Sequence, residues 1–162
     1  FPPMLTARGT LVEDHSAVSR FPHERHCDLQ FFSLIEGSTA IAIPEGANLL
    51  MMSTARQDYQ DGGAVRVPNT MRPIVWALET KGSWTAPERS LHRITWLVEA
   101  RVAKGKLLLC TLNVLNRFDD AYPEAITFFD GLLRYALSDS FSPQGEVSPE
   151  ELSGLLTPYL NG

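Results

Sequence analysis

The six residues 107–112 constrain the fold more than any other segment of the chain. They read Leu-Leu-Leu-Cys-Thr-Leu and follow a natural tight turn at residues 103–106. Successive side chains of a β-strand point to opposite faces of its sheet, so a strand of this composition has two apolar faces. Such strands are typical of the centre of a sheet that is covered by layers on both sides. The run therefore predicts a layered α/β fold, with helices on both faces of a sheet.

Three further runs are predicted to be strands, at residues 39–43, 73–78 and 94–102. The last of them is rich in β-branched and aromatic side chains, and polar residues alternate in its later half. The first is short and is bounded by glycine and proline, which suits a strand between two turns. Because these strands alternate with helical segments, they support a layered α/β fold.

The remaining connections are predicted to be loops. Residues 1–25 are expected to be mostly loop, and residues 44–72 are the least regular part of the chain. Residues 80–91 are also predicted to be a loop, because they contain Gly82, Trp84 and Pro87.

Three segments are predicted to be helices. Residues 28–36 begin at a capping residue, Asp28, and are followed by a glycine at the expected stop. Residues 123–137 begin at a proline and repeat apolar residues at helical spacing. The last helix begins at residues 148–151, Ser-Pro-Glu-Glu, which form a complete capping box.

Composition limits the function classes. The chain has 162 residues, of which 44% are hydrophobic and 20% charged, which suits one globular domain and excludes wholesale disorder. The net charge of −5 argues against non-specific binding to nucleic acid or to an anionic membrane. The chain starts with Phe1 and shows no signal-peptide pattern. We therefore expect that a leader has been removed or that the chain is a piece of a longer protein. If the parent chain carries a leader, we expect a secreted or periplasmic protein.

Residues 23–28, His-Glu-Arg-His-Cys-Asp, hold the densest set of metal-ligand residue types. A metal site usually needs three or four ligands with compatible geometry, and His15 and His92 stand alone in the sequence. We interpret the segment as a helix-entry loop whose polar side chains cap backbone groups, and predict no metal site and no cofactor. Cys27 and Cys110 are predicted to be free, buried thiols.

No catalytic residue is predicted. Cys110 lacks the flanking glycines of a nucleophile elbow. The adjacent acids at residues 119–120 and 150–151 are interpreted as helix-entrance caps. Trp76 and Trp96 lie in predicted strands and are interpreted as packing residues. Trp84 lies in a predicted loop and is the aromatic candidate for stacking against a sugar.

Five stretches, taken in order, resemble the C-terminal region of family 2-type glycoside hydrolases. The clearest is residues 21–32, which is similar to the family form Phe-Pro-Thr-Glu-x-His-x-x-Trp-Gln-Trp-Trp, with Leu29, Phe31 and Phe32 in place of the three tryptophans. The other four lie at residues 9–18, 72–75, 99–110 and 123–135. Together the matches cover residues 9–137.

The resemblance implies a flavodoxin-type, class I amidotransferase-like α/β domain that lacks amidotransferase chemistry and is incomplete at its N-terminus. In that family the catalytic carboxylates lie on a barrel elsewhere in the parent chain. The resemblance therefore implies a non-catalytic accessory domain, and an apolar surface where it packs on a catalytic glycosidase module or supports a homo-oligomer. Within the matched motif His26 and Gln30 are the ligand-binding candidates, joined by Trp84.

Two alternatives remain open at this point. One is a carbohydrate-binding module that uses loop aromatics such as Trp84. The other is a small independent hydrolase with a site at His26 and Asp28. Neither requires nucleic acid, a membrane or a cofactor.

Overall fold

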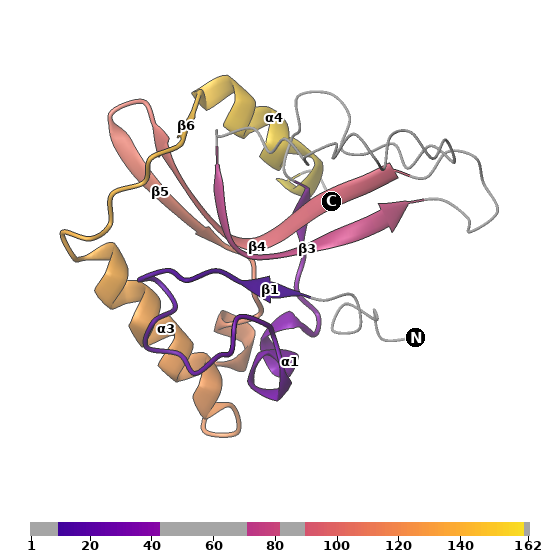
Figure 1. Cartoon of the computed structure of the whole chain (residues 1–162), viewed down its shortest axis with the longest axis vertical. Coiled ribbons are helices and arrows are strands. Elements are labelled where there is room, and N and C mark those ends of the chain that lie inside the picture. The colour runs from indigo at the N-terminus through magenta and orange to yellow at the C-terminus, as the bar shows by residue number, and fades with distance from the viewer. Residues whose placement is uncertain (1–9, 43–70, 82–89, 161–162) are drawn as a thin grey trace, which may run out of the picture.

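The computed structural model of the chain describes residues 10–42, 71–81 and 90–160 (Figure 1). The elements follow one another as β1 (Leu11–Val12), α1 (Leu29–Ile35), β2 (Ile41–Ala42), β3 (Arg72–Lys81), β4 (Ser90–Val102), β5 (Gly105–Cys110), the 3-10 helix η2 (Leu115–Arg117), α3 (Pro123–Ala136), β6 (Glu146–Val147) and α4 (Pro149–Leu160). The class is mixed α/β, as the sequence predicts. No described helix is long and apolar enough to span a bilayer.

The strands form one sheet organised around β4, the longest of them. β4 pairs with β2, β3, β5 and β6, and β1 extends the sheet by pairing with β3. Each pairing is antiparallel except the short ladder between β4 and β6, which is parallel. The β3–β4 hairpin is the main ladder and runs from Arg72 opposite Glu99 to Lys81 opposite Ser90, with register shifts near Val75.

The helices lie on both sides of this sheet (Figure 1). Helices α1 and α3 lie on one face and α4 lies on the other (Figure 1). The larger core fills the α1 and α3 side and includes Phe31, Leu97 and Phe128. The smaller core lies under α4, where Leu152 packs against Val98 and Val147.

Strand β5 is covered on both faces, as predicted, but it is not the central strand of the sheet. Its side chains alternate between the two cores: Leu107 and Leu109 pack in the smaller one, Leu108 and Cys110 in the larger one. The strand is therefore covered on both faces. Within the described residues, however, it pairs with β4 alone and is only half-buried along residues 107–110. The central strand is β4, whose residues 94–100 are all buried.

The three helices form where the sequence predicts them, but the Asp28 side chain makes no capping hydrogen bond at the start of α1. The predicted loop at residues 80–91 is wrong at both ends. The capping box forms, since the Glu151 backbone N–H donates to Ser148 Oγ at 3.1 Å and the Ser148 N–H donates to Glu151 Oε2 at 2.9 Å. The backbone at Thr80 and Lys81 pairs with Leu91 and Ser90. Partner strands satisfy each other's backbone groups, so these residues extend the hairpin despite their loop-like surroundings.

Candidate functional site

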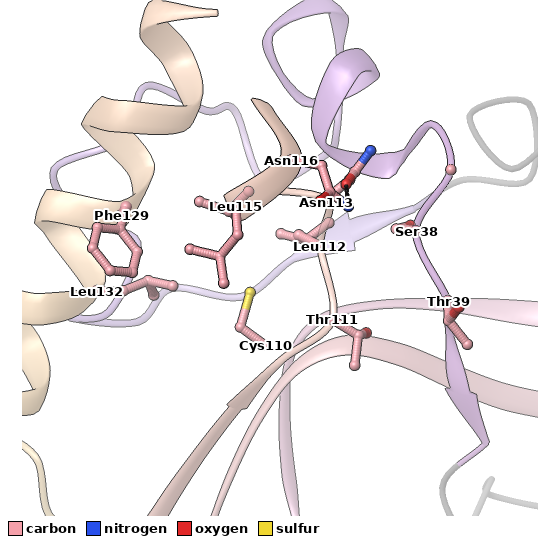
Figure 2. Close-up of a pocket in the computed structure, with 12 residues that line it drawn as sticks. Ser38, Thr39, Cys110, Thr111, Leu112, Asn113, Leu115, Asn116, Phe129 and Leu132 are labelled. Carbon is pink, nitrogen blue, oxygen red and sulfur yellow. Dashed lines mark hydrogen bonds between the residues drawn. The ribbon is translucent and has the colours of Figure 1, made fainter. Parts of the chain in front are cut away.

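A pocket of about 510 Å³ opens between three segments that are far apart in the sequence. Residues 37–39, which follow α1, form one side of it, and residues 110–116, from the end of β5 into η2, form the floor (Figure 2). Phe129 and Leu132 of α3 close the opposite side. This volume lies within the usual range of small-molecule sites, roughly 300–1,000 Å³.

Asn113 fastens the floor of the pocket to the end of α1. Its backbone N–H donates to the Leu34 carbonyl at 2.7 Å, and its side-chain Nδ2 donates to the Glu36 carbonyl at 3.0 Å. Helix α1 stops at Gly37, which has a φ of +71°. A Cβ there would lie 3.4 Å from Asn113 Nδ2. Glycine therefore provides the left-handed turn that places residues 38 and 39 beside the pocket.

Arg117 holds η2 against both neighbouring helices. Its guanidinium donates to the Tyr122 hydroxyl at 2.6 Å, just before α3, and to Glu36 Oε2 at 2.9 Å, just after α1. Close by, the rings of Phe118 and Phe129 meet edge to face with centroids 5.4 Å apart. These contacts fix the apolar wall of the pocket relative to its floor.

Among the described residues, those that line the pocket are all uncharged. Cys110 is its one thiol, and in Figure 2 the sulfur is turned toward the leucine side chains. Burial raises the pKa of the Cys110 thiol to about 11, with a weaker opposing effect from a hydrogen bond with the Leu112 backbone. Because the thiolate is the nucleophilic form of cysteine, this thiol is protonated at neutral pH. The arrangement suits binding of an uncharged molecule.

Two of the three predicted ligand-binding residues lie outside this pocket, and the third is not described. The His26 side chain is exposed, and its Nδ1 donates to the Glu24 carbonyl at 2.9 Å. Gln30 Nε2 donates to the Pro22 carbonyl at 2.7 Å. Both side chains therefore support their own loop, which agrees with the helix-entry interpretation. Trp84 lies outside the described residues.

The His26 and Asp28 pair of the hydrolase alternative is a loose surface contact. His26 Nε2 lies 3.8 Å from Asp28 Oδ2, and both side chains are about half exposed. In the described parts of the chain no group of three or more His, Cys, Asp or Glu side chains is placed to hold a metal ion.

The other residue predictions concern packing. Cys27 is a free, buried thiol, as predicted, and burial raises its pKa to about 12. Cys110 is also free, but its residue is half-buried rather than buried. Trp96 is fully buried. Trp76 is half-buried and donates its Nε1–H to Glu13 Oε1 at 2.6 Å. The packing interpretation is therefore confirmed for Trp96 and stays a prediction for Trp76.

Sequence reasoning missed a buried polar network beneath α3. The Tyr135 hydroxyl donates to Glu99 Oε2 at 2.6 Å, and His15 Nε2 lies 3.2 Å from Glu99 Oε1. The Ala17 N–H donates to His15 Nδ1 at 3.2 Å, so the ring proton sits on Nε2 and points at the carboxylate. His15 does not stand alone, as its sequence context suggested, because the fold brings it to a carboxylate that lies 84 residues away.

Hydrogen bonding decides the charge of this network. Burial by itself would raise the pKa of Glu99, but the hydrogen bonds from His15 and Tyr135 outweigh it and lower that pKa, with help from the Arg72 charge. The pKa of Tyr135 is raised, first by burial and then by its bond to Glu99. The network is therefore an ionised carboxylate held by two donors. None of its three residues lines the pocket. The one sequence signal for it was a glutamate within an apolar strand.

Comparison with known proteins gives a family. No curated protein matches the chain. A family model described as a domain of unknown function, DUF8487, matches residues 2–157. That match spans nearly the whole chain, so the chain belongs to the DUF8487 family.

Proposed function

We propose that this chain is a non-catalytic accessory domain of a carbohydrate-active glycoside hydrolase and packs on the catalytic module of that enzyme. The proposal rests on the ordered resemblance over residues 9–137 and on one structural observation, a second apolar stripe on α3. It assigns no chemistry to the domain itself.

Helix α3 carries two apolar stripes. The inner stripe faces the sheet and is buried; it consists of Ala125, Phe128, Leu132 and Tyr135. The outer stripe lies beside it at helical spacing; it consists of Ile126, Phe129 and Leu133 of α3 and Leu137, which caps the helix. Phe129 is half-buried, whereas Leu133 and Leu137 are 46% and 87% exposed.

The outer stripe continues onto neighbouring residues. Leu115 of η2 is 74% exposed, and Phe118, which contacts Phe129, is 49% exposed. Single exposed leucines are ordinary on protein surfaces, but a run of them marks an interaction site. Burying one such side chain stabilises an interface by roughly 1.5–3 kcal/mol. These side chains therefore form an exposed apolar surface that supports docking on a partner.

The proposal also places the domain in the flavodoxin-type, amidotransferase-like class. Helices on both faces of the sheet favour that class, whereas its strands run parallel and the described ladders are antiparallel apart from β4–β6. An experimental structure of the whole chain tests this point. Further parallel strands outside the described residues would support the assignment, and a sheet that stays antiparallel would overturn it.

The reading frame of the complete gene tests the main proposal. We expect it to encode a glycosidase barrel on the same chain, and the purified 162-residue chain to leave aryl glycosides and glutamine unhydrolysed. A complete frame without a glycosidase module, or hydrolysis by this chain alone, would contradict the proposal.

A further inference from the structure

Strand β5 has one edge without a partner strand. Its other edge pairs with β4 in a continuous register from Gly105 to Cys110, and β5 lies at the margin of the sheet in Figure 1. An open edge presents backbone N–H and C=O groups to which another strand can bind, and native proteins commonly block such edges with proline, bulges or several charges. Residues 105–110 contain no proline and one charged side chain, Lys106. The edge of β5 is therefore able to accept a further strand.

The register decides which backbone groups of β5 point outward. In an antiparallel ladder, residues that bond to the partner strand alternate with residues whose N–H and C=O point away from it. The Arg101 N–H donates to the Gly145 carbonyl at 2.7 Å, beside β6 and on the side of β4 away from β5. Its partner Lys106 therefore directs its own backbone groups away from β4. By the same alternation, the backbone groups of Leu108 and Cys110 also point outward.

These outward groups are unpaired and lie on an apolar strand. Within the part of the chain that the structure describes, they make no backbone hydrogen bond. The side chains of residues 107–110 pack in the two cores, yet each residue stays half-buried, so the side left open is the edge. An extended chain presents N–H and C=O groups at the spacing that matches this edge, as in other cases of strand addition. The chemistry of the edge therefore selects a strand.

We propose that β5 pairs with β5 of a second copy of this chain, across a two-fold axis at Leu108, to form one continuous antiparallel sheet. In this register Leu108 faces its own counterpart, and Lys106 faces Cys110 of the second copy, so each outward N–H meets an outward C=O. The one charged residue of the strand does not face itself, which avoids like charges directly opposite each other. A two-fold contact of this kind closes after two copies. The pairing uses the sheet backbone and goes beyond docking through the outer stripe.

Backbone hydrogen exchange of the full chain, read residue by residue with mass spectrometry, tests the pairing without a substitution. We expect a Kd of roughly 10–100 µM, because an edge contact buries less surface than a standard interface. The amides of Lys106 and Leu108 should exchange slowly at about 500 µM chain and quickly at about 1 µM. Those of Leu107 and Leu109, which bond to β4, should exchange slowly at both concentrations. Sedimentation over the same range should show monomers and dimers and no larger species.

A substitution at the exposed Lys106 locates the contact on the edge. Lys106→Pro removes an outward N–H, and proline is tolerated on an edge strand where the N–H faces solvent. The matched control is Lys106→Ala, which also loses the amine that bonds to the Phe141 carbonyl but keeps the N–H. Because the two-fold axis repeats each contact, the proline removes two bonds between the copies. It should weaken dimerisation at least about tenfold relative to the alanine variant.

The proposal is overturned if the chain stays monomeric at about 500 µM, or if the Lys106 and Leu108 amides exchange equally fast at both concentrations. It is also overturned if Lys106→Pro, shown to be folded by circular dichroism, dimerises as tightly as Lys106→Ala. If the proline variant does not fold, the concentration dependence of exchange decides alone. Protection that requires the proposed catalytic module would assign the edge to another chain and reject pairing with a second copy. Failure of the dimer leaves the accessory role in place, because the reading frame tests that role separately.

Discussion

The two apolar stripes of α3 are made of the same residue types and have different surroundings. The inner stripe packs into the larger core, where Phe128 meets Phe21 and Phe31 edge to face with ring centroids 5.1 and 6.0 Å away. The outer stripe ends in Leu137, which is 87% exposed. The inner stripe therefore contributes to the stability of the fold, whereas the outer stripe is free to contribute to binding. The following substitutions test this division.

Phe128→Ala should have the largest effect on stability. Phe128 is almost completely buried, so truncation leaves a cavity and should lower the free energy of unfolding by about 3–5 kcal/mol. Its neighbour Phe129 is half-buried and faces the pocket, so Phe129→Ala should cost roughly 1–2 kcal/mol. Urea denaturation followed by circular dichroism measures both. Equal losses at the two positions would contradict the division between stripes.

Tyr135→Phe should have the next largest effect, because it removes a donor from a buried carboxylate. The expected loss is about 1.5–3 kcal/mol, as for a hydrogen bond to a charged group. The matched control is Tyr122→Phe, because the Tyr122 hydroxyl accepts a hydrogen bond from the partly exposed Arg117. This substitution should lower the free energy of unfolding by less than about 1 kcal/mol. A control that costs as much as Tyr135→Phe would show that burial of the Glu99 network adds nothing.

The pH dependence of the free energy of unfolding should distinguish Glu99 from other carboxylates. Its folded-state pKa is lowered from the ordinary glutamate value of about 4.5, so as the pH falls the unfolded state binds the proton first. The stabilising contribution of Glu99 is therefore present above about pH 4.5 and is lost as the pH falls through the lower, folded-state pKa. Glu99→Gln should be less stable at neutral pH and should lose less stability on acidification. Unfolding curves of the unsubstituted chain and of Glu99→Gln at pH 7 and in acid measure this difference. If both proteins lose the same stability on acidification, the stabilising role of Glu99 is rejected.

Leu137→Asp should have the smallest effect on stability and a clear effect on association. Because the side chain is exposed, the free energy of unfolding should change by no more than about 0.5 kcal/mol. If the chain docks on a glycosidase module as proposed, its association with that module should weaken at least about tenfold, because a charge would be buried in an apolar interface. Leu29→Asp is the matched control, since Leu29 is 89% exposed but lies on α1. Equal weakening by both variants in a binding titration would argue against the outer stripe as the docking surface.

Local signals in the sequence predicted local structure well. The capping box at Ser148 and the apolar spacing of α3 both appear in the structure, because such signals act within one or two helical turns. The ends of the β3–β4 hairpin were missed, because a residue such as Thr80 becomes a strand residue through its pairing with a distant backbone. The dense polar segment at residues 23–28 and the pocket lie in different parts of the chain. His26 and Gln30 bond to their own loop, while the pocket is assembled from three separate segments without a motif.

The sequence by itself determined the mixed α/β class, the positions of the helices and the burial of both faces of β5. Each follows from the spacing of apolar side chains within a few neighbouring residues. Only the tertiary structure decided that β4 is the central strand, that His15 and Tyr135 meet on Glu99, and which stripe of α3 is buried. The physical reason is that pairing, burial and pocket shape depend on contacts between residues far apart in the chain. A period within one helix gives the spacing of a stripe but does not specify what will cover it.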